Sequence, residues 1–502
     1  MSLSLKQKIG LFFGPALALL LLLFFDLKPG EPLVTRTAAV VVLMALWWIT
    51  EAIPIPATAL IPIALYPLMG IMPGKSVAGL YFNHIIFLFI GGFIMALAMQ
   101  RWKLHRRIAL RIIFLIGASP RKIILGFMAA TFFLSMWISN TATTMMIVPM
   151  ALAIIYKLKE TFKGKDINKF SVGLLIGIAY AASIGGIATL IGTPPNLSFA
   201  RIFQIYFPKA PEISFTNWFV FATPMAVIFL LIAWYVLSRF SLSGEFDQAT
   251  SKKLFREEYA GLGRMSYEES IVLTLFSIMA LLLIFRQNID LGTFVIPGWS
   301  NLFPVPKFID DGTIAISIAL LLFIIPAKSS ETRCLMNWKT ASKLNWGIVL
   351  LFGGGFALAS GFKESGLSQW LGESMSGVED FPPLIIVASV CTTLTFLTEL
   401  TSNTATTEIF LPILGSLATA IKVNPLLLMI PATLSASCAF MLPVATPPNA
   451  IVFGSGEIAM KDMIKFGIIL NLIGIILITS YMFLIGVIVF NIDLSTFPEW
   501  AL

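Results

Sequence analysis

The hexapeptide SNTATT occurs twice in this chain, at residues 139–144 and again at residues 402–407. Each copy is followed by the tetrapeptide TPPN, at residues 193–196 and 446–449. Shorter matches share the 263-residue offset of the hexapeptides: FIGGF at 89–93 with FGGGF at 352–356, and Pro149 with Pro412. Several matches at one offset are not easily chance, so the chain is interpreted as two related halves.

The composition places these halves in a membrane. Of the 502 residues, 58% are hydrophobic and 12% are charged, whereas soluble domains carry about 25% charged residues. So little charge does not cover a water-soluble surface, which excludes a soluble enzyme and a nucleic-acid-binding protein. The three cysteines and two histidines are scattered, which argues against a disulfide scaffold, a metal cluster or a nucleophile–base pair.

A helix needs about 20 apolar residues to cross the hydrocarbon core. Eleven segments are predicted to do so: residues 10–26, 34–50, 52–72, 83–100, 171–204, 216–238, 269–285, 311–326, 345–362, 425–455 and 464–489. Residues 1–25 also have the basic and then apolar character of a signal peptide, but no small-residue cleavage site follows, so a retained first span is expected. Two further segments, 124–156 and 382–421, carry polar residues at their centres, and each is either two short crossings or one re-entrant hairpin.

The positions of Lys and Arg predict the orientation. If both polar-centred segments re-enter without crossing, loops on the N-terminal side hold 25 of the 34 basic residues and the opposite loops hold 9. Basic residues collect in cytoplasmic loops. We therefore expect a multi-pass plasma (inner) membrane protein with a cytoplasmic N-terminus and its C-terminus outside.

Five crossings separate the two SNTATT segments in this topology, and an odd number places the two repeats in opposite orientations. The first hairpin then opens to the inside and the second to the outside. Inverted repeats with interrupted helices are a recurrent design of secondary transporters, in which the site lies near the midplane of the bilayer. The expected fold is an all-α membrane protein with 11 transmembrane helices and two re-entrant hairpins.

Spans 171–204 and 425–455 are too long for one straight crossing, and each contains Pro-Pro in its TPPN motif. Because proline removes a donor and clashes with the preceding turn, each span is predicted to break there. The freed carbonyls and side-chain oxygens suit a small hard cation, and the exposed amides of the next half-helix suit an anion.

Basic residues are missing where such an anion would bind. No Lys or Arg falls within residues 123–156, 170–200, 385–421 or 426–460. Burying a dianion without a counter-ion is very unfavourable. Co-bound cations would remove this cost and make cation-coupled uptake the natural mechanism; protonation of the substrate is the other route.

Glu399 and Glu408 flank the second hexapeptide, where the first repeat has Met136 and Met145. Carboxylates within a membrane are candidate functional groups, so a proton-coupled transporter would rest on Glu399. The interpretation favoured here is that both carboxylates are capped or solvated toward the outer opening of their hairpin.

Two segments next to the predicted spans, residues 101–113 and 364–376, have an apolar stripe along one helical face. The first is basic on its other face, and the second carries acidic residues. Each is either a plain helix at the membrane surface or a hinge arm for a moving domain.

The paired SNT and TPPN motifs, together with WWITEAIP at residues 47–54, resemble the divalent anion/sodium symporter family, and within it the bacterial sodium-dependent dicarboxylate symporters. The resemblance extends from about residue 10 to 490. It implies a homodimer in which a static scaffold carries a transport domain that moves as an elevator. The scaffold would comprise residues 10–123 and 239–381, and the transport domain residues 124–238 and 382–489.

The resemblance also implies the ligands. Substrate carboxylates would meet Asn140, Thr141, Asn403 and Thr404, with Thr193, Pro194, Thr446 and Pro447 nearby. One sodium site would use Ser135, Ser139, Asn140 and the carbonyl of Gly192, and the other Thr398, Ser402, Asn403 and the carbonyl of Ala445.

The resulting hypothesis is a transporter, not an enzyme, that couples uptake of a C4-dicarboxylate such as succinate, fumarate or malate to sodium ions. Its expected partners are the substrate, sodium as co-transported ion, the lipid bilayer and a second copy of the chain, with no nucleic acid. Two alternatives remain open at this point: a dicarboxylate/dicarboxylate exchanger on the same fold, and a proton-linked anion transporter.

Overall fold

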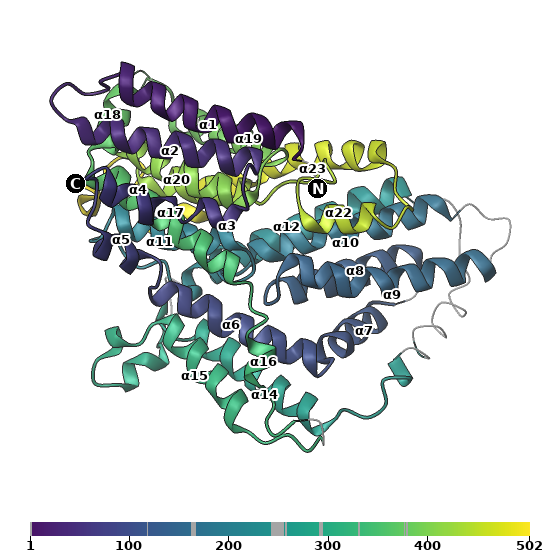
Figure 1. The fold of residues 1–502 in the computed structure, drawn as a ribbon. Coiled ribbons are helices and arrows are strands. Elements are labelled where there is room, and N and C mark those ends of the chain that lie inside the picture. Colours follow the sequence, from purple (N-terminus) through teal and green to yellow (C-terminus); the bar gives the residue numbers. More distant parts are fainter. Residues whose placement is uncertain are drawn as a thin grey trace.

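A computed structural model describes residues 3–502 except 118, 162–166, 242–255, 257–258, 291–294, 330–331, 376 and 378–379. The helices and strands of the described chain are all helices apart from one short β-hairpin, in which β1 (Ile289–Asp290) pairs antiparallel with β2 (Val295–Ile296). Most of the long helices run side by side across the view of Figure 1. The C-terminus lies at the left of that view and the N-terminus toward the right.

The first half begins with α1 (Leu5–Phe24) and α2 (Pro32–Thr50), which pack against each other. Glu51 ends α2 in a left-handed conformation with φ of 51°, which confirms a turn between the second and third predicted spans. The third span, expected as one helix over 52–72, is instead broken into α3 (Ile55–Thr58) and α4 (Ile61–Leu68). Prolines near the start of both short helices remove the donors that a continuous helix needs.

The remaining elements of the first half are as follows: α5 (Gly74–Leu80), α6 (His84–Arg101), α7 (Leu104–Ile116), α8 (Pro120–Ser135), α9 (Asn140–Thr161), α10 (Asn168–Ile187), α11 (Pro194–Tyr206) and α12 (Phe215–Ser241). Helices α8 and α9 form a hairpin whose tip carries Ser139. The long fifth span is broken as predicted, because α10 ends at Ile187 and α11 begins at Pro194 of the TPPN motif.

The second half repeats this order: α14 (Tyr267–Ile284), η1 (Trp299–Leu302), η2 (Pro306–Phe308), α15 (Asp311–Ile324), α16 (Trp338–Ala341), α17 (Trp346–Glu364), α18 (Leu367–Ser374), α19 (Pro383–Thr398), α20 (Asn403–Ala420), α21 (Pro425–Ser435), α22 (Pro447–Phe453), α23 (Met460–Tyr481), η4 (Met482–Gly486), α24 (Val487–Val489) and η5 (Glu499–Ala501). Helices α19 and α20 form the second hairpin, and the second TPPN motif again begins a half-helix, α22.

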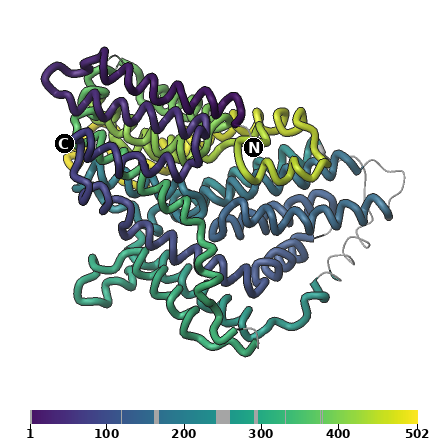
Figure 2. The backbone as a smooth tube through the Cα atoms, viewed as in Figure 1, coloured from purple at the N-terminus to yellow at the C-terminus, as the bar shows by residue number. Residues whose placement is uncertain are grey.

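The two halves interlock. In Figure 2 the teal helices of the first half lie between its blue hairpin and the yellow-green helices of the second half. Helix α10 packs against α8 and α12 of its own half and against α22 of the other. Glycine permits two close approaches, of Gly91 in α6 to Ala315 in α15 and of Gly354 in α17 to Ala59 at the end of α3. The rings of Phe89 and Phe352, which are equivalent positions of the two repeats, meet edge to face with centroids 5.5 Å apart.

Ion pairs join helix ends and loops that the predicted topology assigns to the same side of the membrane. Lys159 lies 2.7 Å from Glu457, and Arg107 lies 2.9 Å from Glu269. On the other side, Arg286 pairs with Glu212 and with Asp311.

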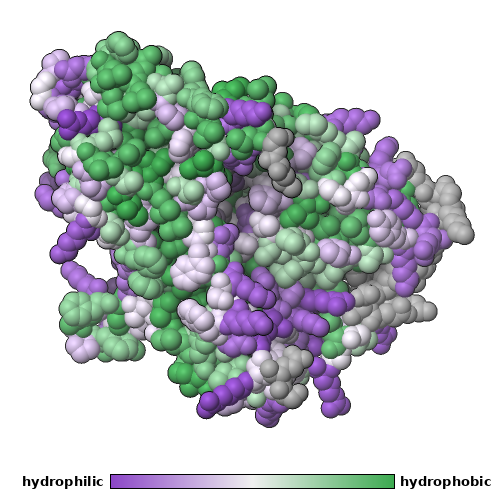
Figure 3. All heavy atoms as spheres, in the orientation of Figure 1, coloured by the Kyte–Doolittle hydropathy of each residue, from purple (hydrophilic) through white to green (hydrophobic). Residues whose placement is uncertain are grey.

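Within the described residues, nine helices are long and apolar enough to cross a membrane, and four shorter apolar helices accompany them. In Figure 3 hydrophobic side chains cover much of the face formed by α1 and α2, and hydrophilic ones gather around α7 and α16.

Candidate functional site

The first hairpin meets the first broken helix through a cluster of three oxygen atoms. The hydroxyl oxygen of Ser135, at the end of α8, lies 2.6 Å from Oδ1 of Asn140 and 2.7 Å from the carbonyl oxygen of Ala182. A hydroxyl has only one hydrogen to donate to these two acceptors. Lone pairs therefore remain at the centre of the cluster, and oxygen lone pairs are the ligands that hard cations prefer.

The second repeat builds the same cluster from equivalent residues. The hydroxyl oxygen of Thr398 lies 2.7 Å from Oδ1 of Asn403 and 2.8 Å from the carbonyl oxygen of Ala436. Ser135 and Thr398 are both fully buried. The alanine carbonyls were not predicted from the sequence, because any residue type supplies one and only the fold brings it to the hairpin.

A buried asparagine in each TPPN motif braces the unwound turn before it. Nδ2 of Asn196 donates to the carbonyls of Gly186 and Thr189 at 3.1 and 2.7 Å. Nδ2 of Asn449 donates to the carbonyls of Ala439 and Leu442 at 3.1 and 3.0 Å. The two side chains reach back to the same relative positions, so the repeats hold their half-helices in the same way.

Glycines bring the first turn close to its cluster. A Cβ on Gly186 would lie 2.6 Å from Oδ1 of Asn140, and one on Gly192 would lie 2.6 Å from the carbonyl oxygen of Gly186. Neither position has room for a side chain. Gly192, expected to offer its carbonyl to a sodium ion, thus packs against Gly186, which in turn packs against Asn140.

Four helices begin at the wall of one cavity. Helices α9 and α20 begin at Asn140 and Asn403, and α11 and α22 begin at Pro194 and Pro447. All four starting residues line one cavity of about 590 Å³. Helix N-termini carry partial positive charge and unsatisfied N–H groups, so their convergence favours an anion in this cavity.

The cavity brings together most of the residues that the sequence indicated. The lining includes Ser139, Asn140, Thr141, Gly192, Thr193, Pro194, Ser402, Asn403, Thr404, Ala445, Thr446 and Pro447. Ser135 and Thr398 do not line the cavity and lie behind it, each in contact with its asparagine.

Sequence reasoning missed several lining residues. Phe89, Gly92 and Phe93 of α6 contribute one wall; their repetition as FIGGF and FGGGF was the signal that could have identified them. Lys6 and Glu51, both exposed, line the cavity at the ends of α1 and α2. The cavity therefore reaches the side that carries the N-terminal end of α1. It also has a basic residue at its rim, although the four segments that build it have none.

Glu399 is capped, as expected, but it is buried and not solvated. Its carboxylate accepts hydrogen bonds from the backbone N–H groups of Phe440, Met441 and Leu442 at 2.7 to 3.0 Å, and from Nδ2 of Asn471 at 2.8 Å. The side chain thereby anchors the unwound segment that leads to Ala445. The first repeat has Met136 at this position and anchors its turn differently. There the hydroxyl of Thr189 donates a hydrogen bond to the carbonyl oxygen of Met136 at 2.5 Å.

The expectation for Glu408 is wrong in both respects. Its carboxyl is fully buried, and the hydrogen bond found for it goes to the side chain of Ser198 on α11 rather than to a backbone cap. The sequence placed Glu408 on the hairpin but did not show that α11 and α17 cover it.

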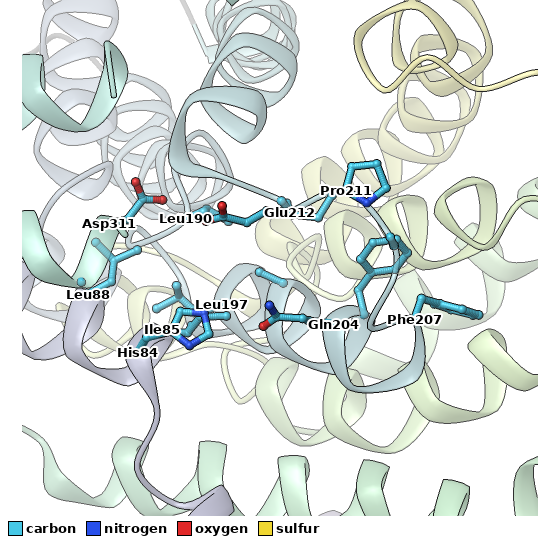
Figure 4. Close-up of a pocket in the computed structure, with 15 residues that line it drawn as sticks. His84, Ile85, Leu88, Leu190, Leu197, Gln204, Phe207, Pro211, Glu212 and Asp311 are labelled. Carbon is cyan, nitrogen blue, oxygen red and sulfur yellow. The ribbon is translucent and has the colours of Figure 1, made fainter. Parts of the chain in front are cut away.

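A second, smaller cavity of about 30 Å³ lies beside His84, Glu212 and Asp311 (Figure 4). The two carboxylates that line it, Glu212 and Asp311, both form ion pairs with Arg286. The SNTATT and TPPN residues do not line it. The geometry therefore favours the larger cavity as the functional site.

Comparisons with known proteins bear on this site. A profile of the family described as "Sodium:sulfate symporter transmembrane region" matches residues 17–492. The sodium-dependent dicarboxylate transporter SdcS of Staphylococcus aureus strain MRSA252 is 46% identical over 498 residues, which cover 98% of this chain and 94% of that protein. SdcS of strain NCTC 8325 matches with the same identity and coverage.

Among solved structures, the YdaH transporter of Alcanivorax borkumensis superimposes with a TM-score of 0.55, covering 82% of this chain and 87% of that one. At 12% sequence identity this likeness shows the fold alone. These relatives are named as transporters, in agreement with the expectation that the chain is not an enzyme.

Proposed function

Because the chain belongs to the sodium:sulfate symporter family, we propose that it is a secondary active transporter that takes up C4-dicarboxylates, such as succinate, fumarate and malate, together with sodium ions. The family is the one that the SNTATT and TPPN motifs indicated, so that resemblance is confirmed. The name of the SdcS relative supports a sodium-coupled dicarboxylate. The choice of C4 substrates is part of the proposal.

One observation carries the proposal: two oxygen clusters, each short of hydrogens, flank a cavity at which four helix N-termini converge. The N-termini suit an anion and the clusters suit hard cations. The four segments that build the site contain no Lys or Arg. Two sodium ions would balance the charge of one dianion, and a third would make transport electrogenic.

The proposed ligand assignments follow the repeat. Substrate carboxylates bind between Asn140-Thr141 and Asn403-Thr404, against Thr193-Pro194 and Thr446-Pro447. The first sodium ion binds among Ser135, Ser139, Asn140 and the Gly192 carbonyl, and the second among Thr398, Ser402, Asn403 and the Ala445 carbonyl. We add the carbonyls of Ala182 and Ala436, which contact the two buried hydroxyls.

The proposed movement is that of an elevator. The hairpins, broken helices, α12 and α23 (within residues 124–238 and 382–489) move as a transport domain against a scaffold formed by the rest. Arms α7 and α18 connect the two. A homodimer in the plasma membrane, with 11 spans and the N-terminus in the cytoplasm, completes the proposal. The cavity of this structure then faces the cytoplasm, because Lys6 and Glu51 line it.

Uptake into proteoliposomes tests the coupling. Vesicles without internal sodium are expected to accumulate labelled succinate when sodium is outside, because an inward sodium gradient then drives the dianion. Choline replaces sodium in the control, and equal uptake in choline would refute symport. Vesicles without any internal dicarboxylate separate symport from exchange, since an exchanger cannot fill them.

Point variants separate sodium coupling from proton coupling. Asn140→Ala and Asn403→Ala are expected to abolish sodium-dependent uptake, because each removes a side chain of one cluster. The proton-linked alternative predicts the reverse pattern, in which Glu399→Gln abolishes transport and both asparagine variants remain active.

A further inference from the structure

Equivalent helices of the two hairpins have different surroundings. Along α9, Met145 is 61% exposed, and Pro149 and Ala153 on the same face are exposed too. Their counterparts along α20 are all buried: Glu408, Pro412 and Ser416. The two helices have the same place in their repeats, so the difference lies in what covers them.

Different packing of the two arms explains this difference. The exposed face of α9 borders a cavity of about 510 Å³, whose far wall includes His105, Arg106 and Leu110 of arm α7. Arm α18 instead packs directly on α20, where a Cβ on Gly372 would lie 2.9 Å from Cβ of Ala420. Helix α17 covers the same face, and Gly355 leaves the space that the Glu408 carboxyl occupies.

Glu408 is a buried acid that has no counter-charge among the described residues. Its Oε1 is hydrogen-bonded to the hydroxyl of Ser198, and its Oε2 has no hydrogen-bond partner among the described residues. The titratable and charged side chains of the helices packed on α20 have other interactions or lie elsewhere on those helices. They are Arg36 of α2, Arg201 and Tyr206 of α11, Lys363 and Glu364 of α17, Glu373 of α18, and Cys391 and Glu399 on and at the end of α19.

Hydrogen bonds place the nearest of these groups. Arg201 donates to Gln204, Lys363 donates to the carbonyls of Ile205 and Tyr206, and the hydroxyl of Tyr206 contacts Ser368. Within the part of the chain that the structure describes, Glu408 forms no ion pair. An ionised carboxylate in such surroundings is very costly, so the side chain takes up a proton and stays neutral.

The inverted repeats indicate what happens to Glu408 when the transporter opens to the other side. In such a fold the two repeats exchange surroundings between the two states. The face of α20 would then be as open as the face of α9 is here, and Glu408 would be as exposed as Met145 is in this structure. The cavity beside Met145 is also lined by Arg106 and Lys157, so we expect its counterpart to hold water. A carboxyl in water ionises at neutral pH.

We propose that Glu408 is a proton-binding site that is occupied in the state seen here and empties into the outside solution when the cavity opens outward. The inference rests on the proposed elevator movement. The proton is a ligand with different affinities for the two states, so its concentration shifts their populations. Acid favours the state of this structure and alkali favours the opposite state, by up to about tenfold per pH unit. The proton returns to the outside and is not delivered to the cytoplasm.

Thiol labelling of Met145→Cys measures the population of the present state, because this side chain is exposed only when α9 faces its cavity. The background carries Cys334→Ser, since Cys391 and Cys438 are fully buried. Protein in proteoliposomes is labelled at neutral and alkaline pH in sodium buffer, with a control for the pH dependence of the reagent. Sodium-dependent uptake of fumarate, which stays a dianion at both values, is measured in the same vesicles.

Labelling is expected to fall several-fold at alkaline pH in this background. With Glu408→Gln added, labelling should stay high at both values, because the amide cannot ionise. Glu408→Met, the residue of the first repeat, serves if the glutamine variant does not fold. A flat profile with Glu408 present, or an equal fall with it replaced, would overturn the inference. Loss of sodium dependence in the uptake arm would instead contradict the proposed function.

Discussion

Thr398→Val is the variant that most directly tests the second oxygen cluster. Valine has nearly the same shape as threonine but replaces the hydroxyl with a methyl group. The hydroxyl lies 2.7 Å from Oδ1 of Asn403 and 2.8 Å from the carbonyl of Ala436. The variant therefore removes one proposed sodium ligand and leaves the other two oxygens in place.

The size of the effect follows from the chemistry of the cluster. A hydrogen bond or ligand contact to a charged group contributes about 1.5 to 3 kcal/mol. A loss of about 2 kcal/mol corresponds to about 30-fold weaker sodium binding. Without sodium, the substitution lowers the free energy of unfolding by less. The hydroxyl has one hydrogen and can satisfy only one of the two acceptors, and a neutral hydrogen bond contributes about 1 kcal/mol.

Sodium-dependent thermal unfolding of the purified protein measures this loss. A ligand that binds only the folded state stabilises it in proportion to the logarithm of its concentration. The sodium concentration at which stabilisation by the second cluster sets in should rise about 30-fold in Thr398→Val. Choline chloride keeps the ionic strength constant throughout the titration.

Thr395→Val is the matched control on the same helix. Thr395 is fully buried, and its hydroxyl has no hydrogen-bond partner among the described residues. Its replacement is expected to leave the sodium titration unchanged. The reasoning would be refuted if Thr398→Val bound sodium as tightly as the unmodified protein, or if both variants weakened binding equally.

Two further variants test the packing around the site. Gly186→Ala is expected to lower sodium-dependent uptake at least tenfold, because its Cβ would lie 2.6 Å from Oδ1 of Asn140. Gly79→Ala, whose added Cβ has no atom of another described segment within 4 Å, should transport normally, and equal activity of the two would count against a constrained turn. Glu399→Gln is expected to lower the free energy of unfolding by about 2 to 4 kcal/mol, because an amide cannot accept all four hydrogen bonds. Calorimetry that finds it as stable as the exposed variant Glu373→Gln would disprove the anchoring role.

Local chemistry made much of the fold predictable. Pro-Pro cannot continue a helix, so the breaks before Pro194 and Pro447 follow from the residues themselves. The two SNTATT copies likewise predicted both hairpins. The apolar length of the third span predicted one helix, but a proline near the start of each piece breaks it into α3 and α4.

The site was only partly predictable, because some of its groups carry no signature. The carbonyls of Ala182 and Ala436 are backbone atoms that any residue provides. Lys6 lies far from the motifs in sequence, and it reaches the rim of the cavity because α1 packs beside α2.

By itself the sequence indicated a membrane protein built from two related halves, and it predicted a site in the motif segments, which contain no Lys or Arg. Only the tertiary structure decided on which side the cavity opens and which of two equivalent helix faces is buried. The physical reason is that the repeats have nearly the same local chemistry in both arrangements. The choice between Met145 exposed and Glu408 buried, or the reverse, depends on packing between segments far apart in the chain.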